Sequence, residues 1–144
     1  MKEISKQLTH LVTDSYEKMD KISKENWNKK IPGKWSKKEI LGHLIDSASN
    51  NHQRFVRAQY EDKTPISYDG DTWVKIQQYT SSDIKTLLGL WLNYNLHLGH
   101  VISEIPVDKY KILFKADAKE AATLEWIVKD YVRHMEHHLK QILN

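Results

Sequence analysis

The chain has 144 residues, of which 40% are hydrophobic and 28% charged. A chain of this length and composition can enclose one apolar core, so we expect residues 1–144 to form a single domain. The absence of cysteine excludes disulfides and thiolate ligands, so a metal ion would have to be bound through nitrogen or oxygen. The net charge of +3 arises from interspersed basic and acidic residues, so we do not expect the protein to bind nucleic acid. No apolar run is long enough for a signal peptide or a membrane span, so we expect a cytoplasmic protein that does not bind a membrane.

Four segments have the periodicity of amphipathic helices, and no stretch alternates long enough to require a strand. The first segment has apolar residues at helical spacing: Ile4, Leu8, Leu11, Met19 and Ile22. The second is expected to begin at Ser36, with Glu39 completing a capping box, and to continue to about Tyr60.

The third helix is predicted to begin near Ser81 or Ser82 and to bury one apolar side. That side contains Ile84, Leu87, Leu88, Trp91, Leu98, Val101 and Ile102. Asn95 lies on the same side, either as a hydrogen-bonded interior residue or as part of a site. The fourth helix is expected to begin at Thr123 as its N-cap and to continue nearly to Asn144.

Long links separate these helices, at residues 24–35, 61–80 and 106–122. The pattern predicts an all-α protein with a four-helix bundle. Links of this length allow at least one crossover between helices that are not antiparallel neighbours.

The final segment, VRHMEHHLKQILN, contains three histidines within five residues. At 100° per residue, His134 and His138 lie one turn apart beside the apolar stripe, whereas His137 turns toward the charged side. Two imidazoles at i and i+4 can bind one metal ion from a single helix. The motif is not HExxH, and such pairs also occur on solvated helix surfaces, so a metal site needs a third ligand.

The strongest candidate for that ligand is His43, in KEILGHLIDSASNNHQRF of the second helix. From His43, a polar stripe continues for three turns through Asp46, Ser47, Asn50 and Arg54. The stripe lies opposite the apolar residues, as a solvent-exposed face would, yet it contains no Lys or Glu. The pattern alone leaves both interpretations open.

The heights of the histidines along their helices constrain the topology. His43 lies roughly 10 Å from the start of its helix, and His134 and His138 lie roughly 9 to 15 Å from the end of theirs. These heights coincide only if the second and fourth helices are antiparallel. That requires an up-down-down-up bundle with a long crossover between helices two and three, which the 61–80 link can supply.

The remaining histidines are expected to have no part in this site. His97 and His100 share the polar side of the third helix, so we expect them to be solvated. His10 and His52 lie away from the relevant faces of their helices and are expected on the surface or in packing contacts.

These residues resemble the DinB/YfiT-like family, a group of bacterial four-helix proteins that bind a divalent metal through three histidines. The resemblance extends from PGKWSKKEILGHLIDSASNNHQRF through PISYDGDTW to TLEWIVKDYVRHMEHHLKQI. It is closer to the YfiT branch, whose crossover has a similar PYD-x-x-W segment. The resemblance implies His43, His134 and His138 as metal ligands, the up-down-down-up order and, often, a homodimer.

For chemistry, the resemblance implies either metal-dependent hydrolases or transferases that use low-molecular-weight thiols such as bacillithiol. Three neutral imidazoles leave Zn²⁺ or Ni²⁺ with at least one open coordination position, where a bound water has its pKa lowered to about 7 and a bound thiol is deprotonated. We expect a divalent-metal-dependent enzyme that transfers a small thiol to a small electrophilic substrate. A hydrolase, a non-catalytic metal-binding module linked to stress, and a helical interaction protein without metal are the alternatives.

Further residues have predicted roles around the metal. Asp46 could orient a ligand histidine or accept a proton. Asn50 and Arg54 lie roughly 10 and 16 Å along the helix, too far to be ligands, and would anchor substrate or form internal salt bridges. Tyr68 and Trp73, in the crossover, are expected to form a wall of the pocket, although Trp73 could instead fill the end of the bundle.

Overall fold

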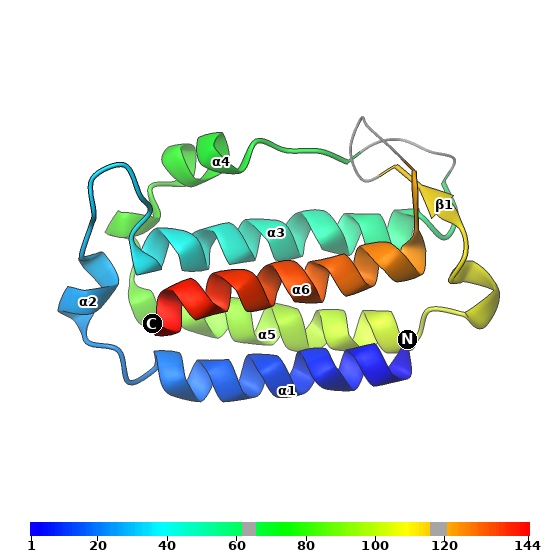
Figure 1. Cartoon of the computed structure of the whole chain (residues 1–144), viewed down its shortest axis with the longest axis horizontal. Helices are drawn as coiled ribbons and strands as arrows, with labels where there is room; N and C mark the ends of the chain where they lie inside the picture. The colour runs from blue at the N-terminus through cyan, green and yellow to red at the C-terminus, as the bar shows by residue number, and fades with distance from the viewer. Residues whose placement is uncertain (62–65, 116–120) are drawn as a thin grey trace.

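The computed structural model describes residues 1–61, 66–115 and 121–144, in which four long helices form a bundle. They are α1 (Lys2–Met19), α3 (Lys37–Arg57), α5 (Ile84–Ser103) and α6 (Leu124–Leu143). The colours of Figure 1 show α1 and α6 running in one direction and α3 and α5 in the other. The predicted up-down-down-up order is therefore confirmed.

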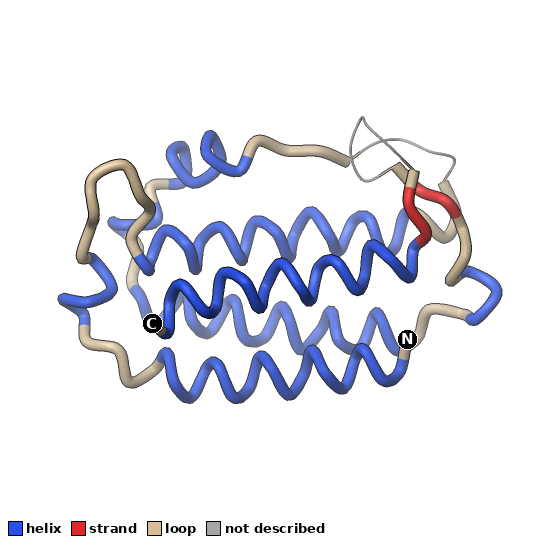
Figure 2. The backbone as a smooth tube through the Cα atoms, in the orientation of Figure 1, coloured by secondary structure: helices blue, strands red, loops and turns tan. Residues whose placement is uncertain are grey.

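The links contain short elements that the sequence patterns did not predict. They are α2 (Lys24–Asn28), α4 (Gly70–Gln77), two 3-10 turns at Tyr79–Ser81 and Val107–Lys109, and strands β1 (Leu113–Phe114) and β2 (Ala122–Thr123), which pair antiparallel. Figure 2 shows the two strands in red beside the start of α6. Elements of two to eight residues are too short to give a periodic signal. Pro65 of the PISYDGDTW segment lies outside the described residues.

Two predicted helix starts are confirmed by their caps. The Ser36 hydroxyl accepts from the backbone N–H of Glu39, and the Glu39 carboxylate accepts from the backbone N–H of Ser36 at 2.7 Å, which is the predicted capping box. The Thr123 hydroxyl accepts from the backbone N–H of Trp126 at the start of α6. These caps fix where the two histidine-bearing helices begin.

Two predicted helix ends were too late. The α1 helix ends at Met19, so Ile22 lies beyond it, and its N–H bonds to the Met19 carbonyl three residues back. The α3 helix ends at Arg57 instead of Tyr60, whose N–H likewise bonds three residues back. Both apolar patterns continue through a final tightened turn, which periodicity cannot distinguish from helix.

The third helix was expected to begin near Ser81 or Ser82, and its N-cap is the next residue, Asp83. Asp83 caps α5, because its carboxylate accepts from the backbone N–H of Thr86 at 2.8 Å. Ser81 belongs to the preceding 3-10 turn. Asp is as good an N-cap as Ser, so three adjacent candidates could not be separated by residue type.

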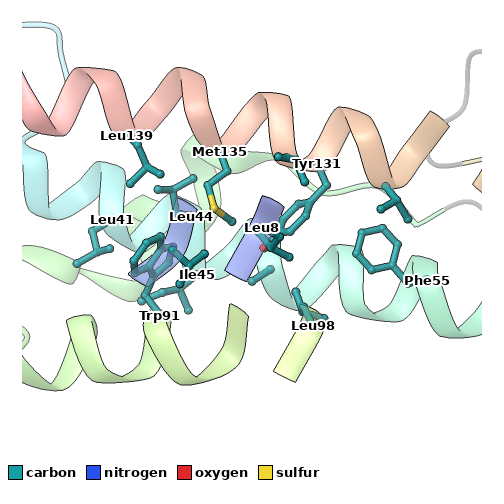
Figure 3. Close-up of a cluster of buried hydrophobic side chains, with 14 of the residues drawn as sticks. Leu8, Leu41, Leu44, Ile45, Phe55, Trp91, Leu98, Tyr131, Met135 and Leu139 are labelled. Atoms are coloured by element: carbon teal, nitrogen blue, oxygen red, sulfur yellow. The ribbon is translucent and has the colours of Figure 1, made fainter. Parts of the chain in front are cut away.

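The core lies between the four helices and is drawn in Figure 3. Its labelled members are Leu8, Leu41, Leu44, Ile45, Phe55, Trp91, Leu98, Tyr131, Met135 and Leu139. Asn95 is completely buried among them, where its amide donates to the Trp91 carbonyl at 2.8 Å and its side-chain oxygen accepts from the Tyr131 hydroxyl. It is therefore a hydrogen-bonded interior residue.

The connection from α3 to α5 positions the candidate site. From residue 66 it runs back along α3, and α4 lies over the N-terminal half of that helix (Figure 1). Side chains on the outer side of α3 and α6 are thereby enclosed by the crossover. None of the described helices is long and apolar enough to cross a membrane.

Candidate metal centre

Three predicted ligands converge where α3 and α6 face each other. His43 comes from α3, and His134 and His138 come from successive turns of α6. Their ring centroids are 5.2 Å apart for His43 and His134, 4.8 Å for His43 and His138, and 4.6 Å for His134 and His138. One nitrogen from each ring lies within 4.8 Å of the other two.

The spacing of two of these nitrogens fits a tetrahedral metal ion. The Nε2 atoms of His43 and His134 are 3.3 Å apart. Two nitrogens that each lie 2.0–2.1 Å from Zn²⁺ at a tetrahedral angle are separated by about 3.3 Å. No fourth His, Cys, Asp or Glu from the described parts of the chain joins the group, so a bound ion would keep a position open for another molecule.

The environment keeps these imidazoles neutral. Burial, followed by the neighbouring His134 and His138, lowers the pKa of His43 to about 4. Burial, followed by the neighbouring His138, lowers the pKa of His134 to about 4. The pKa of His138 is also lowered, again chiefly by burial. Neutral rings at pH 7 retain the lone pair that binding a metal requires.

The outer nitrogens of the three rings have different surroundings. His138 Nδ1–H donates to Gln141 Oε1 at 3.0 Å, and the Gln141 amide in turn donates to His137 Nε2 at 3.1 Å. This bond fixes the tautomer in which His138 Nε2 carries the free lone pair. The Nδ1 atoms of His43 and His134 are buried and have no hydrogen-bond partner in the structure. Leaving two buried polar atoms unpaired is typical of a functional site.

Aromatic rings enclose the triad on two sides. The Trp35 ring lies 4.9 Å from that of His43 and 6.5 Å from that of His138, measured between centroids. On the other side, the Tyr68 ring lies 6.4 Å from that of His43 and 5.2 Å from that of Trp73. Trp73 is 37% exposed, so it lies on the surface and does not fill the bundle.

Gly70, the first residue of α4, allows the crossover to approach the triad. A Cβ added at Gly70 would lie 3.1 Å from Cε1 and 3.2 Å from Nδ1 of His43. A side chain at this position would therefore press on the ring. The glycine of the PISYDGDTW segment thus has a direct role in packing the candidate ligand.

Asp46 lies one turn beyond His43 on α3 and is almost completely buried. Its Oδ1 accepts from the Tyr79 hydroxyl at 2.6 Å and from the Gln77 amide at 2.7 Å, whereas Oδ2 is buried without a partner in the structure. Burial raises the pKa of Asp46, and the bonds from Tyr79 and Gln77 oppose that rise. Asp46 is thus attached to the crossover, with one oxygen still available.

Tyr79 reaches Asp46 because Gly42 gives it room. A Cβ at Gly42 would lie 2.1 Å from a carbon of the Tyr79 ring, so the ring packs directly on the backbone of α3 next to His43. Burial and the hydrogen bond to Asp46 raise the pKa of the Tyr79 phenol far above its usual value. Tyr79 therefore remains a neutral donor to Asp46 at pH 7.

Asn50 and Arg54, further along the polar stripe, have different contacts. Asn50 is buried and donates to the Asp46 carbonyl on its own helix at 2.9 Å. The Arg54 guanidinium donates to the Ile66 carbonyl, at 3.0 Å from Nε, and to Asn51 Oδ1, which ties the crossover to α3. Arg54 and Tyr68 also line a small pocket of about 120 Å³ that reaches His134.

Sequence reasoning did not identify several residues that contact the site. Gln77, Tyr79 and Gly42 support Asp46, and Gln141 supports His138. Gln141 had a usable signal, because it follows His138 by three residues on the same helix face. Gln77 and Tyr79 are distant in sequence and gave none.

Four of the other histidines lie apart from the triad. His10, His97 and His100 are exposed. His52 is half-buried, where its Nδ1 lies 3.2 Å from the Tyr94 hydroxyl and its ring lies 5.3 Å from that of His97. The expectation that they lie on the surface or in packing contacts is confirmed.

Comparisons with known proteins agree with this architecture. The chain matches the model of a protein family described as the DinB superfamily over residues 7–142. It is 27% identical over 112 residues to a Bacillus subtilis (strain 168) protein named "Putative metal-dependent hydrolase YfiT". The match covers 76% of this chain and 63% of that protein, so the chain spans just under two thirds of the relative's length.

A solved structure shares the fold. It is described in the words "YfiT from Bacillus subtilis is a probable metal-dependent hydrolase with an unusual four-helix bundle topology". The TM-score is 0.83, with 23% sequence identity, and the match covers 99% of this chain and 85% of the other. The resemblance expected from the sequence motifs is therefore confirmed.

Proposed function

The chain belongs to the DinB superfamily, and from that premise we propose that it is a divalent-metal-dependent enzyme in which His43, His134 and His138 bind the ion. The observation that carries this proposal is the convergence of three imidazoles with two Nε2 atoms 3.3 Å apart. All three rings have lowered pKa values, which suits them to bind a cation. Zn²⁺ and Ni²⁺ both accept three imidazoles.

Among reactions, we favour transfer of a low-molecular-weight thiol to a small electrophile. A divalent ion at the triad supplies positive charge that lowers the pKa of a thiol or a water bound beside it. In the transfer, the thiol sulfur forms a bond to the electrophilic carbon, the leaving group departs with its bonding electrons, and the thiol proton is taken up by a base. Asp46 is our candidate for that base, because one of its oxygens is unpaired and burial raises its pKa.

The walls of the site would select and orient the substrate. Tyr68 and Arg54 line the pocket beside His134, and we propose that they contact the electrophile. Roles for Asn50 and Trp73 in binding substrate, and the homodimer, stay predictions. The Trp35 ring packs against that of His43 and would exclude water from that side of the site.

Hydrolysis of a small substrate is the second candidate, because the similar Bacillus subtilis protein is named as a metal-dependent hydrolase. The two reactions differ only in the nucleophile, a thiol or a water. A non-catalytic metal-binding module has the same triad but no turnover.

One assay separates these functions. Protein without a histidine tag is loaded with Zn²⁺ or Ni²⁺ and given bacillithiol with 1-chloro-2,4-dinitrobenzene, or p-nitrophenyl acetate without thiol. Thiol-dependent release of chloride that is lost in His134→Ala and retained in His97→Ala supports the transferase. Ester cleavage with the same dependence supports the hydrolase, and a fully metal-loaded protein that catalyses neither reaction contradicts an enzyme of either kind.

A further inference from the structure

A second, larger concavity lies near the triad and includes Trp35, whose ring packs on His43. It lies between α2, the loop that follows it, the start of α3 and the end of α6, and has a volume of about 780 Å³. Clefts of this size typically hold small organic ligands. We call it the lysine groove, after Lys29, Lys34 and Lys37 in its lining; Ile31, Trp35 and Gln141 also line it.

Two of its residues connect the lysine groove to the candidate metal centre. Trp35 forms part of the groove, and the same ring packs 4.9 Å from His43. Gln141, also in the lining, accepts the hydrogen bond from His138 Nδ1. A molecule in the groove would therefore contact the residues that support two of the three imidazoles.

The charge of the groove is one-sided. Its lining contains three lysines and no Asp or Glu side chain. Three exposed lysines outside the groove form ion pairs: Lys18 with Asp14, Lys85 with Asp20, and Lys129 with Glu125. Neither Lys29 nor Lys34 forms an ion pair within residues 1–61, 66–115 and 121–144, whereas Lys37 donates to the Ile142 carbonyl.

An ordered turn positions Lys34 at the groove. Pro32 and Gly33 occupy the middle of the turn, Gly33 has φ of +75°, and the Lys34 N–H bonds to the Ile31 carbonyl at 3.0 Å. This is the pattern of a type II turn, in which the third position favours glycine. The turn leaves Ile31 56% exposed at the groove, so an apolar surface lies next to the ammonium groups.

We propose that the lysine groove binds the anionic part of the substrate, a small organic acid with an apolar segment, and directs its reactive end toward the triad. Lys29 and Lys34 would hold the carboxylate, and Ile31 with Trp35 would contact the apolar segment. The reactive end would then lie beside His43 and His138. The proposal rests on the proposed function for its catalytic meaning, but the groove can be tested by binding alone.

The test compares an acid with its neutral counterpart on the intact, zinc-loaded protein. Binding of 3-phenylpropionate and of 3-phenylpropionamide is followed by NMR at the Trp35 indole and Gln141 amide signals. The acid is expected to bind about tenfold more tightly, and Lys29→Gln/Lys34→Gln to remove that preference while the affinity for the amide is unchanged. The control variant Lys2→Gln/Lys6→Gln changes two exposed lysines of α1 and removes the same amount of charge. It is expected to keep the preference for the acid.

Equal affinity for acid and amide, an unaltered preference in the Lys29/Lys34 variant, or signals that move at Tyr68 instead of Trp35 would each overturn the proposal. Zinc content measured on the same samples separates the two proposals. Full zinc loading without preference for the acid contradicts the groove and leaves the metal centre intact. A preference for the acid in protein that binds no zinc supports the groove and contradicts the metal centre.

Discussion

Two groups of histidines occupy different ends of the interface that α3 forms with its neighbours, and only one has the properties of a metal site. In the triad, three rings lie 4.6–5.2 Å apart between α3 and α6 and are packed against Trp35. The second group joins His52 of α3 to His97 of α5 at 5.3 Å, with His100 a further 6.5 Å from His97.

The difference lies in enclosure and in the third donor. In the second group His97 and His100 are exposed and the His52 Nδ1 is occupied by Tyr94, so no set of three nitrogens converges there. Two imidazole rings about as close together as those of the triad therefore do not make a metal site by themselves. A metal centre needs a third imidazole and surroundings that keep all three neutral.

The largest expected effect is on metal binding itself. His134→Ala removes the central ligand from α6, so we expect stoichiometric zinc to be lost, with affinity reduced by at least about 100-fold. His97→Ala is the matched change in the second group and is expected to leave zinc content unchanged. Elemental analysis and calorimetric titration of tag-free protein measure both, and full zinc occupancy in His134→Ala would falsify the triad.

Acid should destabilise the metal-free protein through the buried rings of the triad. The pKa values of His43 and His134 are about 4 in the folded chain, against 6.5 in the unfolded chain. Between these values the unfolded state binds more protons, so the free energy of unfolding falls as the pH is lowered from 6.5 to 4, by on the order of 3 kcal/mol for each ring. Above pH 6.5 these two groups contribute no further change.

Urea denaturation at pH 7 and pH 4.5 measures this loss. His43→Asn/His134→Asn should flatten the dependence on pH, because neither ring remains to be protonated. An equal slope in the double variant and the natural chain would show that other groups cause the acid sensitivity.

The contact between Gly42 and Tyr79 tests how closely the crossover must approach the triad. Gly42→Ala introduces a Cβ 2.1 Å from the Tyr79 ring, and overpacking of this kind costs about 2 kcal/mol. Gly89→Ala is the control, because a Cβ there meets nothing within 4 Å and alanine favours a helix interior by up to about 1 kcal/mol. Thermal unfolding should show opposite signs for the two variants, and a stable Gly42→Ala protein would mean that Tyr79 can move aside freely.

Much of the triad could be predicted from the sequence, because the geometry of a regular helix fixes which residues share a face. The i, i+4 spacing of His134 and His138, and the heights of these residues and His43, required α3 and α6 to be antiparallel. The capping boxes and caps at Ser36 and Thr123 fixed where the helices begin. These inferences needed only local patterns.

The crossover could not be predicted in the same way. Its contacts, from Tyr79 to Asp46 and from Gly70 to His43, join residues that are separated by 27 to 33 positions and belong to short elements without periodicity. The same holds for Gly42, which looks like an ordinary helix residue until the Tyr79 ring is placed beside it. Such contacts depend on how a link folds back, and no local spacing encodes that.

The smallest expected effect on zinc affinity is that of changing Gln141, which forms hydrogen bonds to the rings of both His138 and His137. In the described parts of the chain, the second group of histidines has no residue in this role. Gln141→Ala removes the acceptor that holds His138 Nδ1–H at 3.0 Å, so zinc affinity should fall by about tenfold. Gln141→Glu keeps an acceptor at this position and should retain most of the affinity, although the donor to His137 is lost. Gln53→Ala, which removes an exposed glutamine from α3, is the control and should leave affinity unchanged. If Gln141→Ala and Gln53→Ala bind zinc equally well, the hydrogen bond from His138 to Gln141 is not needed for metal binding. The His138 ring would then be oriented by its packing against Trp35 alone.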